Sequence, residues 1–146
     1  MTQVSIGKQT LGVDIESTQD LYRSLPVVDP TCCNGCATFL LALDRKILPR
    51  ELTDLVSRMG IRLDRPIEVW GAPDGGFLQI WWPFVNTPDF EGFNPSQPLV
   101  ELDPGIRCGI TTHAPQPDWA ISRDIRIPIL EITWQHDIVQ QLEAAL

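Results

Sequence analysis

The spacing of apolar residues predicts an amphipathic helix over residues 49–59. Leu52, Leu55, Val56 and Met59 recur at i, i+3, i+4 and i+7, which places them on one face of a helix. A proline at the first position and a glycine just beyond the last agree with the residues usually found at helix ends. This segment has the most regular helical pattern in the chain.

Two earlier segments show the same period in a weaker form. Residues 17–25 have apolar positions on one side, and Ser17 or Thr18 is suited to cap the first turn. Residues 34–47 form a longer apolar face, with Asn34 as the predicted N-cap. The first half of the chain is therefore predicted to be mainly helical.

After residue 60 the hydrophobic pattern becomes typical of strands. The predicted strands are residues 66–70, 77–85, 99–102, 106–112 and 125–134. Gly75 and Gly76 favour a hairpin turn between the first two, because glycine adopts positive φ without strain. Pro128 indicates that the last strand lies at an edge or contains a bulge, because proline cannot donate to a β-ladder.

The remaining segments complete the order of elements. Residues 1–12 are predicted to be a frayed start or an edge strand, 86–98 and 113–123 irregular loops, and 135–146 a terminal helix. The sequence thus predicts an α+β fold with a mostly antiparallel sheet, two N-terminal helices and a C-terminal helix. No Pro-, Gly- or Ser-rich linker divides the chain, so we expect residues 1–146 to form a single domain.

Charge limits the classes of partner. The chain of 146 residues has a formal net charge of −8. A negative field repels nucleic acid phosphates and anionic membrane surfaces, and it attracts a basic protein partner. No segment has the pattern of a targeting sequence or of a membrane span. We therefore expect a cytoplasmic protein of bacterial type that binds a protein partner, basic in charge, and binds neither nucleic acid nor membrane.

Four cysteines raise the question of metal binding. Cys33 and Cys36 form a C-x-x-C motif at the start of a predicted helix, which is the ligand spacing of one half of a zinc site. Cys108 and His113 would supply the other two ligands and complete a Cys₃His set. The alternative is that the protein has no cofactor and its cysteines are simply packed as small apolar residues.

The same motif also suits thiol–disulfide exchange, in which the first thiolate attacks and the second thiol resolves. The stretch from Asp29 to Asp44 resembles the start of small DCC-type thiol oxidoreductases, which have an aspartate, two cysteines and then an apolar helix. The spacing differs by one residue from that pattern, and no βαβ pattern surrounds the motif. A thiol–disulfide oxidoreductase using Cys33 and Cys36 is therefore a further alternative function.

Aromatic residues are the candidate contacts for a partner. Trp81 and Trp82 are adjacent on a predicted strand, so their side chains face opposite sides of the sheet. One of them is expected to enter the core, and the other to be covered by a helix, a loop or a partner. The loop 86–98 has phenylalanines among acidic residues, a composition typical of docking surfaces. The predicted partner-binding set is Trp82, Asp89, Phe90, Glu91 and Phe93.

Catalytic motifs are absent from the sequence. There is no G-x-S-x-G, P-loop, G-x-G-x-x-G or H-E-x-x-H pattern, and we assign no catalytic residue. The balance favours a non-catalytic protein-binding or inhibitor protein, in the manner of a small immunity protein against a basic toxin or nuclease. A zinc-stabilised domain and a thiol oxidoreductase are the alternatives.

The run from Tyr22 to Val85 resembles a group of small bacterial proteins with an N-terminal cysteine loop and a tryptophan-rich hairpin. The features in common are Leu25-Pro26, the cysteine loop followed by Phe39, a helix ending near Gly60-Ile61, a Pro66-x-Glu68 strand start, and a hairpin with Trp82 and Phe84-Val85. The resemblance covers less than half of the chain. It agrees with the predicted fold and implies no particular activity.

Overall fold

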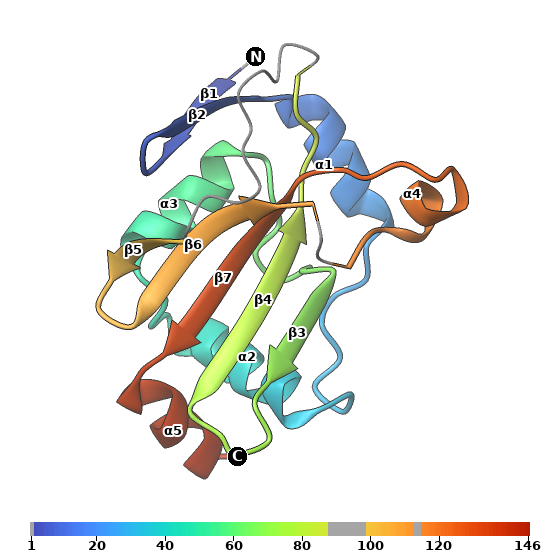
Figure 1. Ribbon diagram of the computed structural model, residues 1–146. Coiled ribbons are helices and arrows are strands. Elements are labelled where there is room, and N and C mark those ends of the chain that lie inside the picture. Colours follow the sequence, from blue (N-terminus) through green and yellow to red (C-terminus); the bar gives the residue numbers. More distant parts are fainter. Residues whose placement is uncertain (1, 88–98, 113–114) are drawn as a thin grey trace.

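Figure 1 shows a computed structural model of the chain, which describes residues 2–87, 99–112 and 115–146. Within these ranges the chain forms seven strands and five helices. The strands are β1 (Thr2–Ile6), β2 (Gln9–Val13), β3 (Glu68–Gly71), β4 (Phe77–Pro83), β5 (Val100–Asp103), β6 (Ile106–Thr111) and β7 (Ile129–Gln135). The helices are α1 (Ile15–Ser24), α2 (Asn34–Asp44), α3 (Arg50–Arg58), α4 (Asp118–Ser122) and α5 (Asp137–Ala144).

Five strands form one antiparallel sheet in the order β3-β4-β7-β6-β5, which confirms the predicted α+β class. The last strand, β7, lies in the middle of this sheet, between β4 and β6 (Figure 1). The prediction of an edge position or a bulge from Pro128 was wrong, because β7 begins just after that proline. The missing N–H therefore falls outside the ladder, and the carbonyl of Pro128 accepts a hydrogen bond from the Phe84 N–H at 3.1 Å.

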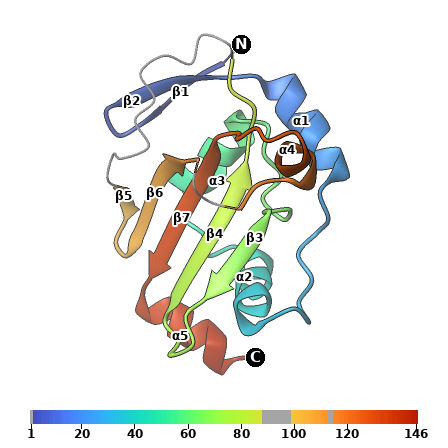
Figure 2. The same cartoon turned by 45° about the vertical axis from the view of Figure 1, so that its right-hand side comes forward.

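One face of the sheet is buried because every second residue of its inner strands is apolar. In β4 these residues are Leu78, Ile80 and Trp82, all fully buried. Helices α2, α3 and α5 lie behind this face in Figures 1 and 2 and pack on it. Phe39 of α2 meets Trp82 edge to face, with ring centroids 6.0 Å apart. We call this side of the sheet the covered face and the opposite side the open face.

The first strands form a separate antiparallel hairpin, β1-β2. Val4, Ile6, Leu11 and Val13 alternate along it and belong to the main core. Gly7 closes the turn with φ of 63°, a conformation that glycine adopts without strain. The alternative of a frayed start was therefore wrong for this segment, because its alternating apolar side chains are anchored in the core.

The C-terminal helix is present, but three helices precede β3 where the predicted arrangement had two N-terminal helices. Two helices begin at other residues than predicted, and one helix was not predicted. The carboxylate of Asp14 caps α1 by accepting hydrogen bonds from the Ser17 N–H at 3.0 Å and the Ser17 hydroxyl at 2.9 Å. Ser17 is thus the donor to the cap and not the cap itself. The N-cap of α2 is Cys33, and Asn34 is the first helical residue. Helix α4 lies within residues 113–123, where a loop was predicted.

Candidate functional site

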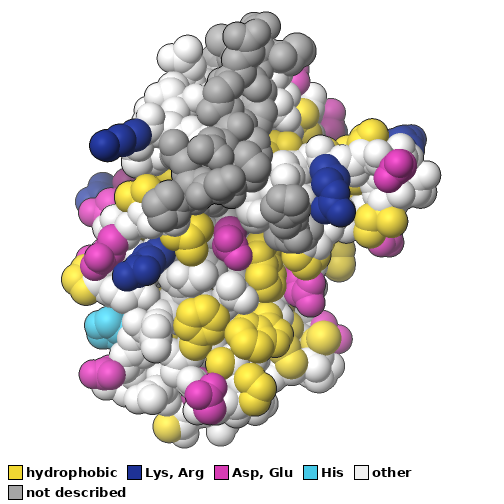
Figure 3. All heavy atoms as spheres, viewed as in Figure 1, with side chains coloured by type: hydrophobic (Ala, Val, Ile, Leu, Met, Phe, Trp, Pro, Cys, Tyr) yellow, Lys and Arg dark blue, Asp and Glu magenta, His cyan; other side chains and the backbone are white. Residues whose placement is uncertain are grey.

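The open face of the sheet presents three aromatic side chains. Trp70 pairs with Gln79 and Glu68 with Trp81, so the alternation along β3 and β4 places Trp70, Phe77 and Trp81 on the same side. Trp70 is 43% exposed, and the other two are partly exposed. We call these three residues the aromatic patch. Figure 3 views the molecule from this side and shows hydrophobic side chains gathered over the strands.

Neighbouring side chains hold the patch in place. The rings of Trp70 and Phe77 meet edge to face, with centroids 6.0 Å apart and an interplanar angle of 72°. The indole N–H of Trp81 donates a hydrogen bond to Oε1 of Glu131 on β7, at 3.1 Å. Each of the three rings of the patch is therefore held by a contact with a neighbouring side chain.

The charges around the patch are mainly negative. Glu131 lies directly opposite Trp81 in the ladder, and Glu68 lies on the other side of Trp81. Farther across the same face, Arg107 pairs with Glu101 in the register of β5 and β6. The open face of these strands thus has three carboxylates and one guanidinium.

A shallow hollow continues the aromatic patch across the open face. It has a volume of about 250 Å³, and Phe77, Arg107 and Thr133 are among the residues that line it. Toward α1 and α4 the open face is closed by a small apolar cluster that contains Ile129 and Leu21, and Trp81 of the aromatic patch packs against it. The accessible part of the open face therefore lies at the end of the sheet away from this cluster.

The structure corrects the predicted partner-binding set. Trp82 is 0% exposed, and its indole N–H donates to the carbonyl of Leu63 at 3.1 Å, so its assignment as a surface contact was wrong. The physical reason is that successive side chains of a strand face opposite sides of the sheet, so Trp82 points to the covered face and Trp81 to the open face. The other predicted members, Asp89, Phe90, Glu91 and Phe93, lie outside the described residues.

Sequence reasoning missed the contributions of Trp70 and Phe77 to this surface. The register of the β3-β4 hairpin would have shown them, because Gly71 pairs with Leu78 across the turn and Trp70 with Gln79. Phe77 is then the diagonal neighbour of Trp70 on the same side of the sheet. The turn glycines indicate a hairpin, but they leave the length of its loop open, and that length sets the register.

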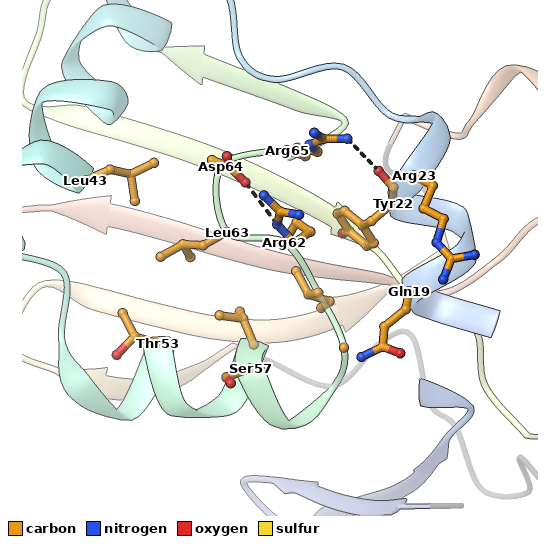
Figure 4. A pocket seen from close by; sticks show the side chains of 13 residues that line it. Gln19, Tyr22, Arg23, Leu43, Thr53, Ser57, Arg62, Leu63, Asp64 and Arg65 are labelled. Carbon is orange, nitrogen blue, oxygen red and sulfur yellow. Dashed lines mark hydrogen bonds and ion pairs between the residues drawn. The ribbon is translucent and has the colours of Figure 1, made fainter. Parts of the chain in front are cut away.

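A larger concave region lies on another side of the molecule, between α1, α3 and the segment after α3 (Figure 4). Its volume is about 1020 Å³, and three arginines line it. Arg23 forms an ion pair with Asp20 at 2.8 Å, and Arg62 lies 3.6 Å from a carboxylate oxygen of Asp64. Two of the three arginines are thus paired with acids of the protein itself.

The third arginine of this region, Arg65, has a structural role. Its Nη1 donates to the carbonyls of Tyr22 and Leu25, at 3.0 and 3.2 Å, and so occupies acceptors at the C-terminal end of α1. The hydroxyl of Tyr22 in turn donates to the carbonyl of Pro83 at 2.7 Å. These hydrogen bonds connect α1 to the segment after α3 and to the sheet. Arg65 Nε is buried without a hydrogen-bond partner.

The cysteine loop precedes α2 and has a defined geometry. The sulfurs of Cys33 and Cys36 lie 3.2 Å apart, within hydrogen-bond distance of each other. Cys33 Sγ also accepts a hydrogen bond from the Cys36 backbone N–H at 3.3 Å, which makes Cys33 the N-cap of α2. Cys33 is exposed, whereas Cys36 is 7% exposed.

The two thiols of the motif differ in their electrostatic surroundings. Burial raises the pKa of Cys36 to about 12, and the hydrogen bonding and charge of Cys33, followed by those of Cys32, add to the increase. Near neutral pH the Cys36 thiol therefore keeps its proton. Cys33 is the more accessible of the two sulfurs and has a backbone N–H directed at it.

The predicted zinc ligands do not come together in the part of the chain that the structure describes. No group of three or more His, Cys, Asp or Glu side chains there could hold a metal ion. Cys108 is fully buried on β6, whereas Cys33 and Cys36 lie beside the edge strand β3. Strands β3 and β6 are three positions apart in the sheet, which corresponds to about 14 Å at the usual spacing between strands. The assignment of these three cysteines to one site was wrong, and His113 lies outside the described residues.

Comparison with protein-family models, with curated proteins and with solved structures finds no match. The resemblance to a group of small bacterial proteins therefore stays a prediction. Among the described residues, no helix is both long enough and apolar enough to cross a bilayer.

Proposed function

We propose that this protein is a binding protein that holds a basic segment of another protein on the open face of its sheet, a function that needs no catalytic residue. The observation that supports the proposal is the aromatic patch: Trp70, Phe77 and Trp81 share one accessible face beside the carboxylates of Glu68 and Glu131. An inhibitor of immunity type, directed against a basic toxin or nuclease, is the class of protein that best fits this surface.

The chemistry of the patch favours a cationic partner. Tryptophan faces attract guanidinium and ammonium groups, and a carboxylate beside the ring adds an ion pair to the same side chain. Glu131 already accepts a hydrogen bond from Trp81 and has acceptor capacity left for a partner's arginine or lysine. The net charge of −8 would also steer a basic partner toward the protein.

The same features disfavour other ligands on this face. Nucleic acid also stacks on exposed aromatic rings, but its phosphates would meet three carboxylates and one guanidinium. A drug-sized ligand usually occupies a deeper cavity than the hollow of about 250 Å³ beside Phe77. Protein surfaces, by contrast, commonly bind through a few aromatic anchors surrounded by polar residues.

The proposal can be tested by selecting random peptides on the purified protein and measuring the affinity of the selected peptides by fluorescence anisotropy. We expect enrichment of sequences that combine arginine or lysine with apolar residues. The variant Trp70→Ala should weaken binding by about tenfold or more, since it removes the most exposed ring. Glu131→Gln should weaken it by about threefold and reduce its salt dependence, because the amide keeps an acceptor for Trp81 but loses the charge.

The matched control is Ile121→Ala, which removes an exposed apolar side chain on α4 that is not a member of the aromatic patch. This variant should bind the selected peptides as tightly as the unaltered protein does. Enrichment of acidic or uncharged peptides, no enrichment at all, or equal losses in Trp70→Ala and Ile121→Ala would each contradict the proposed function.

A further inference from the structure

The cysteine loop presents two thiols with different accessibility on one short segment. Cys33 is exposed and Cys36 is 7% exposed, yet their sulfurs are 3.2 Å apart. A disulfide bond is about 2.05 Å long, so the sulfurs must approach by only about 1.2 Å to form one. The rest of the loop is held by a turn in which the Asp29 carboxylate accepts hydrogen bonds from the N–H and the hydroxyl of Thr31, at 2.8 and 2.7 Å.

We propose that Cys33 and Cys36 form a thiol–disulfide exchange site, at which Cys33 attacks an accessible disulfide and Cys36 resolves the mixed disulfide. The proposal does not depend on the protein-binding function, because it uses other residues. The contact between the two sulfurs is its main support: a mixed disulfide on Cys33 would keep its sulfur beside the Cys36 thiol. Effective concentrations in such intramolecular steps greatly exceed those of free thiols.

The exchange has two steps. In the first, the Cys33 thiolate attacks one sulfur of a substrate R–S–S–R, forms a Cys33–S–R bond and releases RS⁻. In the second, the Cys36 sulfur attacks Cys33 Sγ and forms the Cys33–Cys36 disulfide, the Cys33–S–R bond breaks, and the proton of Cys36 passes to the departing sulfur, which leaves as RSH. The protein loses two electrons and two thiol protons, and the substrate gains them as two molecules of RSH.

The position of each sulfur matches its role. Cys33 Sγ accepts a hydrogen bond from the Cys36 N–H at the start of α2, so a backbone donor and an exposed surface meet at the sulfur that attacks. Cys36 is shielded from solvent, so an external disulfide reaches it less easily than it reaches Cys33. Cys32 is exposed as well, but the hydrogen bond from the Cys36 N–H goes to Cys33 Sγ, and Cys33 is the N-cap of α2.

The experiment incubates the reduced, full-length protein with glutathione disulfide, quenches it with acid and identifies the modified cysteines by mass spectrometry of alkylated peptides. The unaltered protein should form the Cys33–Cys36 disulfide and retain no glutathione. Cys36→Ser should accumulate one glutathione on Cys33, at a rate about tenfold above that at Cys32. Cys33→Ser should leave the Cys36 thiol free, and Cys32→Ser should behave like the unaltered protein.

Two further measurements complete the test. A peptide with one exposed disulfide, used in place of glutathione disulfide, shows by its relative rate whether small or peptide disulfides are the better substrates. Circular dichroism reports whether each variant is folded, and Cys36→Ala replaces Cys36→Ser if the buried hydroxyl prevents folding. Preferential glutathionylation of Cys32 in the Cys36 variant, or an unaltered protein without a Cys33–Cys36 disulfide, would overturn the proposal.

Discussion

Adjacent residues on one strand have opposite fates in this protein. Trp81 faces the open side of the sheet, and Trp82 lies in the core with its indole N–H bonded to the Leu63 carbonyl. The aromatic residues of the hairpin therefore divide into a structural set and an accessible set. A measurement of stability distinguishes the two sets independently of any ligand.

We expect Trp82→Ala to lower the free energy of unfolding by about 3–5 kcal/mol, because it leaves a cavity in the core. Trp70→Ala should lower it by no more than about 1 kcal/mol, since Trp70 is 43% exposed and loses mainly its contact with Phe77. Urea titrations of the two variants check this difference. Similar losses of stability in Trp82→Ala and Trp70→Ala would contradict the assignment of these two side chains to opposite faces of the sheet.

The buried Cys108 thiol is expected to make the stability of the fold decrease with rising pH in the alkaline range. Its burial, with a smaller effect from the charge of Glu131, raises the pKa of Cys108 from 9.0 to about 12. Between these values the unfolded chain releases the thiol proton while the folded chain retains it, so stability falls as the pH rises. The slope reaches about 1.4 kcal/mol per pH unit for one such group.

The test compares denaturant unfolding at about pH 8 and about pH 11 for the unaltered protein and for Cys108→Ala. The variant should lose less stability between the two values, because it no longer has the buried thiol. Cys32→Ala serves as the control and should lose as much as the unaltered protein, since Cys32 is exposed. Tyr22 and Cys36, whose pKa values are raised mainly by burial, are present in all three proteins, and Cys32 is a lesser cause of the Cys36 shift than burial and Cys33 are.

At the scale of elements, the contact between α2 and β3 fixes the position of the cysteine loop. A methyl group on Gly35 of α2 would lie 2.7 Å from the backbone nitrogen of Gly71 and 3.1 Å from its Cα. The two backbones therefore touch at a point where only glycine fits. This contact places the Cys33–Cys36 pair beside the edge strand that carries Trp70.

Gly35→Ala is expected to destabilise the protein by about 1–3 kcal/mol, as overpacking usually does. Alanine in place of glycine normally stabilises a helix, so the close approach to β3 reverses the usual sign. Thermal unfolding measures the effect. As a control, Ser57→Ala on an exposed position of α3 should be neutral or slightly stabilising. An increase in stability on Gly35→Ala would contradict the α2–β3 contact.

At the scale of the whole molecule, the sheet depends on its last strand. β7 pairs along its whole length with β4 on one side, and over residues 129–134 with β6 on the other. Without β7, no strand connects β4 to β6, and the core loses the apolar side chains that β7 contributes to the covered face. We therefore expect the chain to fold only once nearly all of it is present.

A fragment of residues 1–123 should show no cooperative unfolding transition, since it lacks β7 and α5. Near-ultraviolet circular dichroism and urea titration are the measurements. Deletion of Ala145 and Leu146 alone, both exposed beyond α5, should leave the transition unchanged. A cooperative transition in the fragment of residues 1–123 would show that the β7 pairings are not needed for folding.

The local patterns of the sequence were enough to predict the α+β class, the helix that became α3, the turn between β3 and β4, and the pairing of Cys33 with Cys36. Each of these depends on residues a few positions apart, for which helical and strand periods or turn chemistry are sufficient. The placement of Cys108, the central position of β7 and the side of the sheet that remains open depend on strand order and register. These are set by the packing of segments distant in the chain, and so only the tertiary structure decided that the accessible aromatic patch is Trp70, Phe77 and Trp81.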